Sequence, residues 1–529
     1  MKKPFILITA VIALSTPLVA QKTASSKPNI IFIYADDLGY GDLSCYGATS
    51  IKTPHIDKLA KNGLKLTDAH STAATCTPSR FSILTGSYAF RNNAAILPGD
   101  APLLIRPGTP TLPGMLQNAG YTTGVVGKWH LGLGDGTINW NTEIKPGPKE
   151  IGFDYSFLIP ATQDRVPCVF VENGRVVNLD PNDPITVSYN QIVGDDPTGL
   201  NHPEMLKMKA DTQHSNTIVN GISRIGFMSG GNAARWKDED FPEVLLKKAT
   251  TFITDNKSKP FFLYFSLSDI HVPRDPNPMF KGKTTMGRRG DNIVQMDWTT
   301  GELMKALDKL GLTKNTLVIF SSDNGPILND GYDDNSETLV GNHKPAGPFN
   351  GGKYSAYEGG TRVPTIIYWP SKIKPGVSSA LINQVDFYAS FAKLTGQQLS
   401  ENEAPDSYDI LPALLGKSMT GRQTMLEESF TLAVRNGSWK YIAPQAKGTP
   451  LWLKDKDVAT GLSTREQLFN LKTDMAEKYN VIEKYPAEAK RLKQLLKTIE
   501  AQGTRPRYKN KISNEVSIIK YGSENSIVD

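Results

Sequence analysis

Two pairs of oxygen-bearing side chains are the first candidates for chemistry in this sequence of 529 residues. Asp36 and Asp37 come directly after one apolar run, and Asp323 and Asn324 come just after another. Carboxylate and amide oxygens are hard donors that suit Ca²⁺ or Mg²⁺. Taken separately, each pair is also a common turn sequence, which is the alternative interpretation. Their matching positions after two apolar runs favour a shared metal site.

Basic and imidazole side chains form a second set of candidates. His130 and His271 each follow an apolar run and suit general acid or base work. Lys128, Lys353 and Arg80 carry charges that suit an anionic substrate. A lone histidine more often has a structural role, and we assign that role to His55, His70, His202 and His343.

Cys76 is the most informative single residue, in the segment Ala74-Thr75-Cys76-Thr77-Pro78-Ser79-Arg80. The segment is typical of the start of a helix, where the helix terminus and a nearby arginine lower the pKa of a thiol and favour a nucleophile. The alternative is a buried structural cysteine, and the residues alone leave both open. Cys45 and Cys168 are the other two cysteines, which either form a disulfide or remain buried thiols.

These residues need elements that bring them together, and an alternation of two patterns supplies such elements. Wholly apolar short runs predict buried strands, and periodic segments between them predict helices. The alternation predicts an α/β fold with a parallel or mixed sheet covered by helices on both faces. Ligands bind at the carboxyl ends of the strands in such sheets, where the candidate residues fall. The predicted strands are 29–34, 121–127, 260–266 and 316–321, and the predicted helices are 54–63, 111–120, 241–256 and 292–310.

Two regions differ from this alternating part. Residues 135–235 are rich in Pro, Gly, Asn and Asp, and we expect them to form long loops around the site. From about residue 425, two short strands around Asn436-Gly437 and a helix over 485–503 predict a small α+β domain. We therefore expect a catalytic domain over 28–424 and a C-terminal domain over 425–529.

The first 20 residues predict a secretory signal peptide. Lys2 and Lys3 precede a short apolar run, and small residues follow up to Ala20. The run is too short to span a bilayer comfortably, so we expect no stable membrane insertion. The net charge of +6 and the 21% of charged residues are ordinary for a globular enzyme and do not indicate a nucleic-acid partner.

Five segments resemble the motifs of the type I sulfatases, the formylglycine-dependent family that includes secreted bacterial carbohydrate sulfatases and arylsulfatase A-like enzymes. The segment around Cys76, continued by Leu84-Thr85-Gly86, is similar to the Cys-x-Pro-Ser-Arg signature. The other four segments are 36–42 and 322–325, which resemble the two metal motifs, 120–130, which resembles the second signature, and 351–364, which resembles the segment with the last catalytic lysine. They occur in the family's order over most of the chain. One position departs from the pattern, because Ile270 precedes His271 where the family usually has proline.

The resemblance implies an alkaline-phosphatase-like fold and a specific chemistry. In this family a maturation enzyme converts the motif cysteine, here Cys76, to formylglycine (3-oxoalanine), whose hydrate is the nucleophile. His271 is then the expected general acid and His130 the expected base, while Lys128, Lys353 and Arg80 counter charge on the sulfate. The implied metal is Ca²⁺ rather than Mg²⁺, held by Asp36, Asp37, Asp323, Asn324 and the modified Cys76.

The implied function is an exo-acting sulfatase of glycans in the periplasm or outside the cell. We expect 6-O-sulfated galactose or N-acetylgalactosamine as the substrate. Asp164, Arg165 and His214 are expected to hydrogen-bond sugar hydroxyls, and the alternative is that they are solvated loop residues. Two other functions remain open, a phosphodiesterase or phosphonate monoester hydrolase of the same superfamily and a non-catalytic glycan-binding protein. The complete set of nucleophile and histidines argues against the latter.

Overall fold

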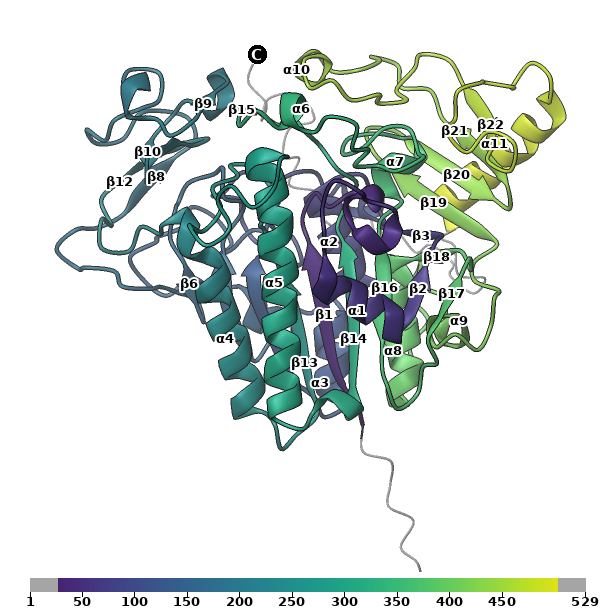
Figure 1. The fold of residues 1–529 in the computed structure, drawn as a ribbon, viewed down its shortest axis with the longest axis horizontal. Helices are drawn as coiled ribbons and strands as arrows, with labels where there is room; N and C mark the ends of the chain where they lie inside the picture. The colour runs from purple at the N-terminus through teal and green to yellow at the C-terminus, as the bar shows by residue number, and fades with distance from the viewer. Residues whose placement is uncertain (1–26, 503–529) are drawn as a thin grey trace, which may run out of the picture.

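A computed structural model describes residues 27–502, and its core is a large mixed β-sheet (Figure 1). The predicted signal peptide, residues 1–20, lies outside the described residues. The five central strands, β14, β1, β13, β4 and β5, run parallel to one another. In spatial order the ten strands of this sheet among the described residues are β17 (Gly376–Ser378), β2 (Leu64–Leu66), β16 (Thr365–Tyr368), β14 (Thr316–Ser322), β1 (Asn29–Ala35), β13 (Phe261–Ser266), β4 (Thr122–Lys128), β5 (Tyr155–Ile159), β6 (Val171–Glu172) and β7 (Arg175–Val176).

Helices cover both faces of this sheet. One packed group is α1 (Pro54–Asn62), α4 (Phe241–Asp255) and α5 (Gly287–Lys309), which lie side by side in front of the strands in Figure 1. The second packed group is α2 (Cys76–Thr85), α3 (Leu112–Asn118) and α8 (Phe387–Thr395). All seven residues of β1 are buried, as expected for a strand with helices on both sides. The predicted α/β sandwich is confirmed.

The strand register places the candidate residues at one edge of the sheet. Ala35 of β1 is level with Ser322 of β14, so the residues after each strand emerge together. Tyr34 and Gly127 are both level with Ser266 of β13, which aligns the ends of β4 and β13 with that of β1. The carboxyl ends of four neighbouring strands therefore meet where the sequence predicts ligand binding.

Two sequence expectations about the elements were wrong. The region 135–235 is not only loops, because β5, β6 and β7 extend the main sheet and β5 pairs directly with β4. A strand of five residues has little effect on the composition of a region of about a hundred residues. Strand β5 makes backbone hydrogen bonds with β4, which lies outside this region. Helix α5 begins at Gly287 rather than at 292. Its first turn has no apolar side chains and is stabilised by an ion pair of 2.6 Å between Arg289 and Asp42.

Short strands and helices complete the described region. Around the site edge lie β9 (Lys209–Ala210), β15 (Tyr332–Asp333), α6 (Ser336–Leu339), α7 (Glu358–Thr361) and α10 (Leu451–Lys454). Elsewhere are α9 (Leu411–Leu414), β3 (Ala69–His70), β18 (Ile382–Asn383), β8 (Thr186–Ser188), β10 (Ile218–Val219), β11 (Ile222–Ser223) and β12 (Phe227–Ser229).

The C-terminal part is a four-stranded antiparallel sheet with one long helix. Its elements are β19 (Thr424–Glu428), β20 (Leu432–Asn436), β21 (Trp439–Ile442), β22 (Gln467–Asn470) and α11 (Pro486–Gln502). The turn between β20 and β21 contains the predicted Asn436-Gly437, with Gly437 at φ 61°. Leu492 and Leu496 of α11 pack into a core with Val434 and Tyr441 of the sheet.

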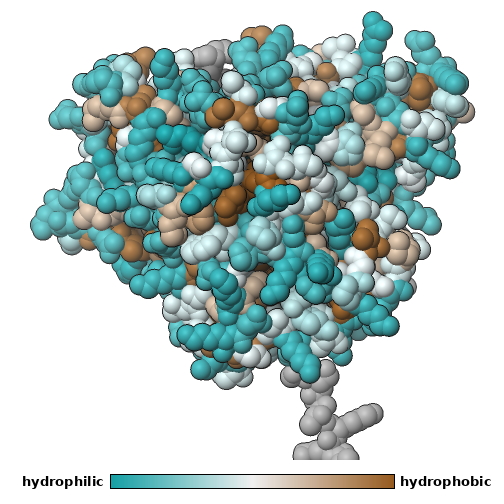
Figure 2. Space-filling view, in the orientation of Figure 1, coloured by the Kyte–Doolittle hydropathy of each residue, from teal (hydrophilic) through white to brown (hydrophobic). Residues whose placement is uncertain are grey.

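On the face in Figure 2, hydrophilic side chains predominate and hydrophobic ones are scattered. Within residues 27–502 no helix is both long and apolar enough to cross a membrane. Cys45, Cys76 and Cys168 all lie in this range and are free thiols, so the disulfide alternative for Cys45 and Cys168 does not hold.

Candidate active site

Four oxygen-bearing side chains converge at the ends of β1 and β14. Asp36, Asp37, Asp323 and Asn324 are each at most 1% exposed. The Asn324 amide donates a hydrogen bond of 2.7 Å to Asp37 Oδ1, and Asp37 N–H donates one of 3.4 Å to Asp323 Oδ1. Among the described residues, Asp36 Oδ1 and Asn324 Oδ1 are buried without a hydrogen-bond partner. Buried oxygens are normally satisfied, so these unpaired acceptors fit an oxygen-coordinated cation.

Each of the three carboxylates also faces a buried cation from the chain. Lys128 Nζ lies 2.5 Å from Asp36, Lys353 Nζ lies 2.9 Å from Asp37, and an Arg80 nitrogen lies 2.7 Å from Asp323. Burial raises the pKa of Asp36 to about 6, and the neighbouring Asp323 raises it further against the effect of Lys128. The structure thus brings the predicted carboxylates together with Lys128, Lys353 and Arg80 in one buried cluster.

Cys76 is the first residue of α2 and is only 2% exposed. Its Sγ lies 3.2 Å from His130 Nδ1, while His130 Nε2 lies 2.8 Å from the carbonyl oxygen of Leu97. The carbonyl can only accept, so Nε2 carries the proton and Nδ1 is left as the acceptor that faces residue 76. His130 is therefore oriented as a base toward position 76.

One expectation about Cys76 was wrong. Burial raises the pKa of its thiol, where the sequence predicted that it would be lowered. Arg80, which was expected to stabilise a thiolate, instead pairs with Asp323 through two nitrogens. The unmodified side chain at this position is thus a protonated, weak nucleophile.

Local backbone geometry fixes the direction of these side chains. Asp37 and His130 adopt left-handed conformations with φ of 58° and 52°, which non-glycine residues rarely occupy. Gly127, at φ 109°, lies so close to β13 that a Cβ would be 1.8 Å from the oxygen of Ser266. Such backbone strain is typical of functional sites, where several side chains must point toward the same place.

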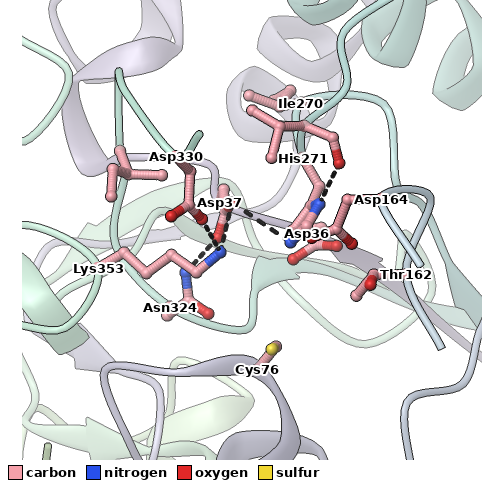
Figure 3. Close-up of polar contacts among 12 residues, drawn as sticks. Asp36, Asp37, Cys76, Thr162, Asp164, Ile270, His271, Asn324, Asp330 and Lys353 are labelled. Atoms are coloured by element: carbon pink, nitrogen blue, oxygen red, sulfur yellow. Dashed lines mark hydrogen bonds and ion pairs between the residues drawn. The ribbon is translucent and has the colours of Figure 1, made fainter. Parts of the chain in front are cut away.

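His271 approaches the cluster from the segment after β13 (Figure 3). Its Nδ1 lies 2.6 Å from the Val272 carbonyl oxygen and is therefore protonated. Its Nε2 faces Asp37 at 4.0 Å. Burial, with Lys128 and Lys353 nearby, holds the pKa of His271 well below its usual value. His271 thus presents an unprotonated Nε2 toward Asp37 and the oxygen cluster, although Ile270 replaces the usual proline.

Comparisons with known proteins identify the family of the chain. The chain matches the sulfatase family model over residues 28–397. It belongs to the sulfatase family. It is therefore a sulfuric ester hydrolase, and the predicted activity class is confirmed.

Similar proteins agree with this assignment. The sulfatase is 52% identical over 483 residues to an N-acetylgalactosamine-6-O-sulfatase of Bacteroides thetaiotaomicron, covering 90% of this chain and 94% of that one. It is 32% identical to human arylsulfatase A, covering 88% of this chain and 85% of the relative. A solved B. thetaiotaomicron structure, described as a 6S-sulfatase from a locus for glycosaminoglycan metabolism, superposes with a TM-score of 0.88 at 52% identity, covering 90% of this chain and all of that one.

A more distant likeness concerns the fold alone. The phosphonate monoester hydrolase of Agrobacterium radiobacter has a TM-score of 0.56 at 17% identity, with 90% of this chain and 96% of that one covered. Together with the sulfatase structures, it confirms the alkaline-phosphatase-like architecture.

The sulfatase site contains a buried acid that the sequence did not reveal. Asp330 lies in the segment between β14 and β15, and its carboxylate is 2.9 Å from Lys353 Nζ (Figure 3). Lys456, from the C-terminal part, is 3.3 Å from the same carboxylate. Asn329-Asp330-Gly331 is typical of a turn, and no motif lies near Lys456, so neither residue could be found from the sequence.

The three expected sugar-contacting residues form one linked group. Arg165 donates hydrogen bonds of 2.9 Å to Asp164, and His214 Nε2 lies 3.5 Å from Asp164. His214 Nδ1 lies 2.6 Å from Asp211. Although burial opposes the shift, Arg165, His214 and His271 hold the pKa of Asp164 well below its usual value. Asp164 lies beside His271 in Figure 3, so the group lies next to this histidine rather than in free solvent.

Proposed function

We propose that this sulfatase removes 6-O-sulfate from galacto-configured sugars, with N-acetylgalactosamine 6-sulfate as its substrate. The observation that carries the proposal is the 52% identity, over nine-tenths of both chains, with the B. thetaiotaomicron N-acetylgalactosamine-6-O-sulfatase. A TM-score of 0.88 against a structure described as a 6S-sulfatase supports it. The substrate is the terminal sulfated sugar of a chain, so the enzyme acts in exo fashion on sulfated glycans.

The proposed metal is a single Ca²⁺ held by Asp36, Asp37, Asp323, Asn324 and the modified side chain of Cys76. Ca²⁺ is preferred over Mg²⁺ because a crowded set of protein oxygens suits its higher coordination number. The two unpaired oxygens of the site support this assignment. When bound, the cation would supply positive charge that polarises the sulfate and lowers the pKa of a nearby hydroxyl.

Cys76 is the proposed precursor of formylglycine, whose hydrate would supply the attacking hydroxyl. The raised pKa of the thiol supports this role, because a protonated thiol in a dry site is a poor nucleophile. His130 Nδ1, 3.2 Å from Sγ of residue 76, is placed to accept a proton from an oxygen at that position.

His271 is the proposed general acid toward the leaving sugar oxygen. Its Nδ1 proton is committed to the Val272 carbonyl, so a proton gained when the anionic substrate enters resides on Nε2, which faces the site. Lys128, Lys353 and Arg80 are proposed to counter charge on the sulfate oxygens. Fixed charges in a buried site act strongly because no water has to reorganise around them.

Asp164, Arg165 and His214 are proposed to bind hydroxyls of the sulfated sugar. A carboxylate accepts and a guanidinium donates, so the pair can fix two hydroxyl groups at once. Asp164 and His214 are buried, Arg165 is partly buried, and Asp164 is coupled to His271, which supports this role over that of solvated loop residues.

The proposed setting is the periplasm or the cell exterior, reached through the N-terminal signal peptide. There the enzyme would meet its glycan, after a maturation enzyme has converted Cys76. The proposed domain division at 424/425 is compatible with the start of β19 at Thr424.

A substrate panel tests the proposed function. Purified enzyme with oxidised residue 76 is incubated with defined monosaccharide and disaccharide sulfates, and free sulfate is measured. We expect release from N-acetylgalactosamine 6-sulfate and from galactose 6-sulfate. Activity confined to glucosamine sulfates or sulfolipids would contradict the substrate, and faster hydrolysis of an aryl phosphate than of an aryl sulfate would contradict the reaction.

A further inference from the structure

Lys353 is held between two carboxylates rather than by one. Its Nζ is 2.9 Å from Asp37 Oδ2 and 2.9 Å from Asp330 Oδ2. Figure 3 shows both acids joined to the ammonium group by dashed lines, on the side away from Cys76. Lys353 is 1% exposed and Asp330 is 6% exposed, so no bulk water screens these contacts. The position of the Lys353 ammonium group is thus set by both acids.

The C-terminal part of the chain supplies a second cation for Asp330. Lys456 lies two residues after α10, is 7% exposed, and has its Nζ 3.3 Å from Asp330 Oδ1. The Tyr354 hydroxyl lies 3.2 Å from the same carboxylate. On its other side Lys456 Nζ is 3.9 Å from Asp211. The charges therefore alternate in sign, in the order Asp37, Lys353, Asp330 and Lys456, which are buried, and Asp211, whose side chain is 43% exposed.

The alternation matters because each charge acts on its neighbours through a poorly screened medium. With Lys456 present, the charge of Asp330 is shared between two ammonium groups. Without Lys456, the Asp330 carboxylate would attract only the Lys353 ammonium group and would pull it away from Asp37 and from the position of the sulfate. Removing one partner of a buried pair also leaves an uncompensated charge, which favours local rearrangement.

We propose that Asp330 and Lys456 are positioning residues that hold the Lys353 ammonium group in place for the reaction, so that the C-terminal domain completes the active site. This inference rests on the proposed role of Lys353 in countering charge on the sulfate. Burial opposes ionisation of Asp330, but Lys353 and Lys456 hold its pKa far below the usual value, so it remains a carboxylate.

The first test replaces Lys456 by methionine, which keeps the length of the side chain and removes its charge. Steady-state kinetics are measured on the best substrate of the panel. We expect Lys456→Met to lower kcat by about tenfold or more, because Lys353 is displaced from charge that develops in the transition state, and to change KM by less than about twofold. Lys456→Arg, which keeps the charge, should recover most of the lost kcat.

The matched control is Lys454→Met. Lys454 is exposed and lies two residues earlier in the same segment. Its variant should keep the kcat and KM of the unmodified sequence. A wild-type kcat in Lys456→Met would overturn the proposal. So would a change confined to KM, because that result would assign Lys456 to sugar binding through Asp211 and His214.

A double-mutant cycle then tests whether Lys456 acts through Asp330. If it does, Asp330→Asn combined with Lys456→Met should be no slower than Asp330→Asn alone, because contacting residues are not additive. Losses that multiply would overturn the proposal. The comparison of the double variant with Asp330→Asn can still be made if Lys456→Met alone fails to fold. The double variant lacks both the Asp330 carboxylate and the Lys456 ammonium group, so neither is left buried without its partner. A wild-type enzyme that releases no sulfate from any member of the panel contradicts the proposed function itself, which separates the two failures.

Discussion

At the scale of single residues, the position of Cys76 supports the proposal that the side chain encoded there is a precursor. The thiol is buried, protonated and 3.2 Å from the nitrogen of His130 that lacks a proton. An oxygen nucleophile at the same position would give its proton to that nitrogen. The geometry is therefore more useful to a hydroxyl than to the thiol that the sequence encodes.

We expect Cys76→Ala to abolish sulfate release without unfolding the protein, because the nucleophile is lost while a small side chain fits the buried position. Sulfate release and the thermal unfolding midpoint are measured together, with Cys45→Ala as the control that keeps activity. Mass spectrometry of the peptide with residue 76 gives a second check. An active preparation that contains only unmodified Cys76 would refute the proposed chemistry.

The buried oxygen cluster leads to a prediction about metal removal. Chelation should abolish activity and lower the unfolding midpoint by several degrees, because Asp36, Asp37 and Asp323 then repel one another and a ligand that binds only the folded state is lost. Added Ca²⁺ should restore both more effectively than Mg²⁺. The control is Asp36→Asn, whose unfolding midpoint should respond less to Ca²⁺. An unchanged midpoint in the chelated wild-type protein would argue against the metal site.

At the scale of elements, the end of β4 shows how tightly the backbone is constrained. Gly127 and Gly120 both have positive φ, of 109° and 83°. A Cβ on Gly127 would meet the Ser266 carbonyl oxygen at 1.8 Å, whereas a Cβ on Gly120 would meet nothing within 4 Å. The two positions share backbone strain and differ in available space.

This contrast predicts different costs for the same substitution. Gly120→Ala should lower the free energy of unfolding by about 1 kcal/mol, from backbone strain alone. Gly127→Ala should lower it by about 3 kcal/mol or more and reduce activity, because β4 must separate from β13 and carry Lys128 and His130 with it. Denaturant unfolding with an activity assay measures both. Equal costs at the two positions would show that the close contact with Ser266 is not limiting.

Elements formed by local patterns were predictable from the sequence, and elements formed by distant contacts were not. The runs at 29–34 and 316–321 are wholly apolar, so β1 and β14 were predicted, along with the oxygen pairs that follow them. β5 and the first turn of α5 depend on partners elsewhere, namely β4 and Asp42. Asp330 and Lys456 escaped prediction for the same reason, because an ion pair between residues far apart in the chain leaves no local pattern.

At the scale of the whole molecule, a buried charge network joins the catalytic part to the C-terminal sheet. Lys440 of β21 contacts Glu358 of α7 at 3.2 Å, Glu427 of β19 at 2.5 Å and Glu477 at 3.2 Å. Burial raises the pKa of Glu427 and of Glu477 to about 7, and proximity to Glu358 adds to this effect against the opposing effect of Lys440. Glu427 and Glu477 therefore remain partly protonated near neutral pH.

This protonation predicts a pH dependence of stability. A carboxyl with a raised pKa in the folded state stays protonated after the unfolded chain has released its proton, so its contribution to stability falls as pH rises from about 4.5 to about 7. The side chain introduced by Glu427→Gln does not titrate. The unfolding midpoint of this variant should therefore rise relative to that of the wild type as the pH increases from 5 to 8. The exposed Glu483→Gln should track the wild type. A midpoint difference for Glu427→Gln that stays constant or moves the other way would contradict the assignment.

The C-terminal sheet also determines when Cys76 can be reached by another protein. Ala74 N–H donates a 2.7 Å hydrogen bond to the carbonyl oxygen of Glu428 in β19, and the Ala74 carbonyl accepts one of 2.8 Å from Tyr354 N–H. The loop before Cys76 is thus held by β19 and by the turn at Tyr354, which both come several hundred residues later in the chain, and the Cys76 side chain is 2% exposed. If Cys76 is oxidised by a maturation enzyme, as we propose, that enzyme would have to act before this part of the chain folds. Folding of the C-terminal sheet, β19 to β22, would close that interval, so under this proposal the rate of folding would limit how much of the protein is activated.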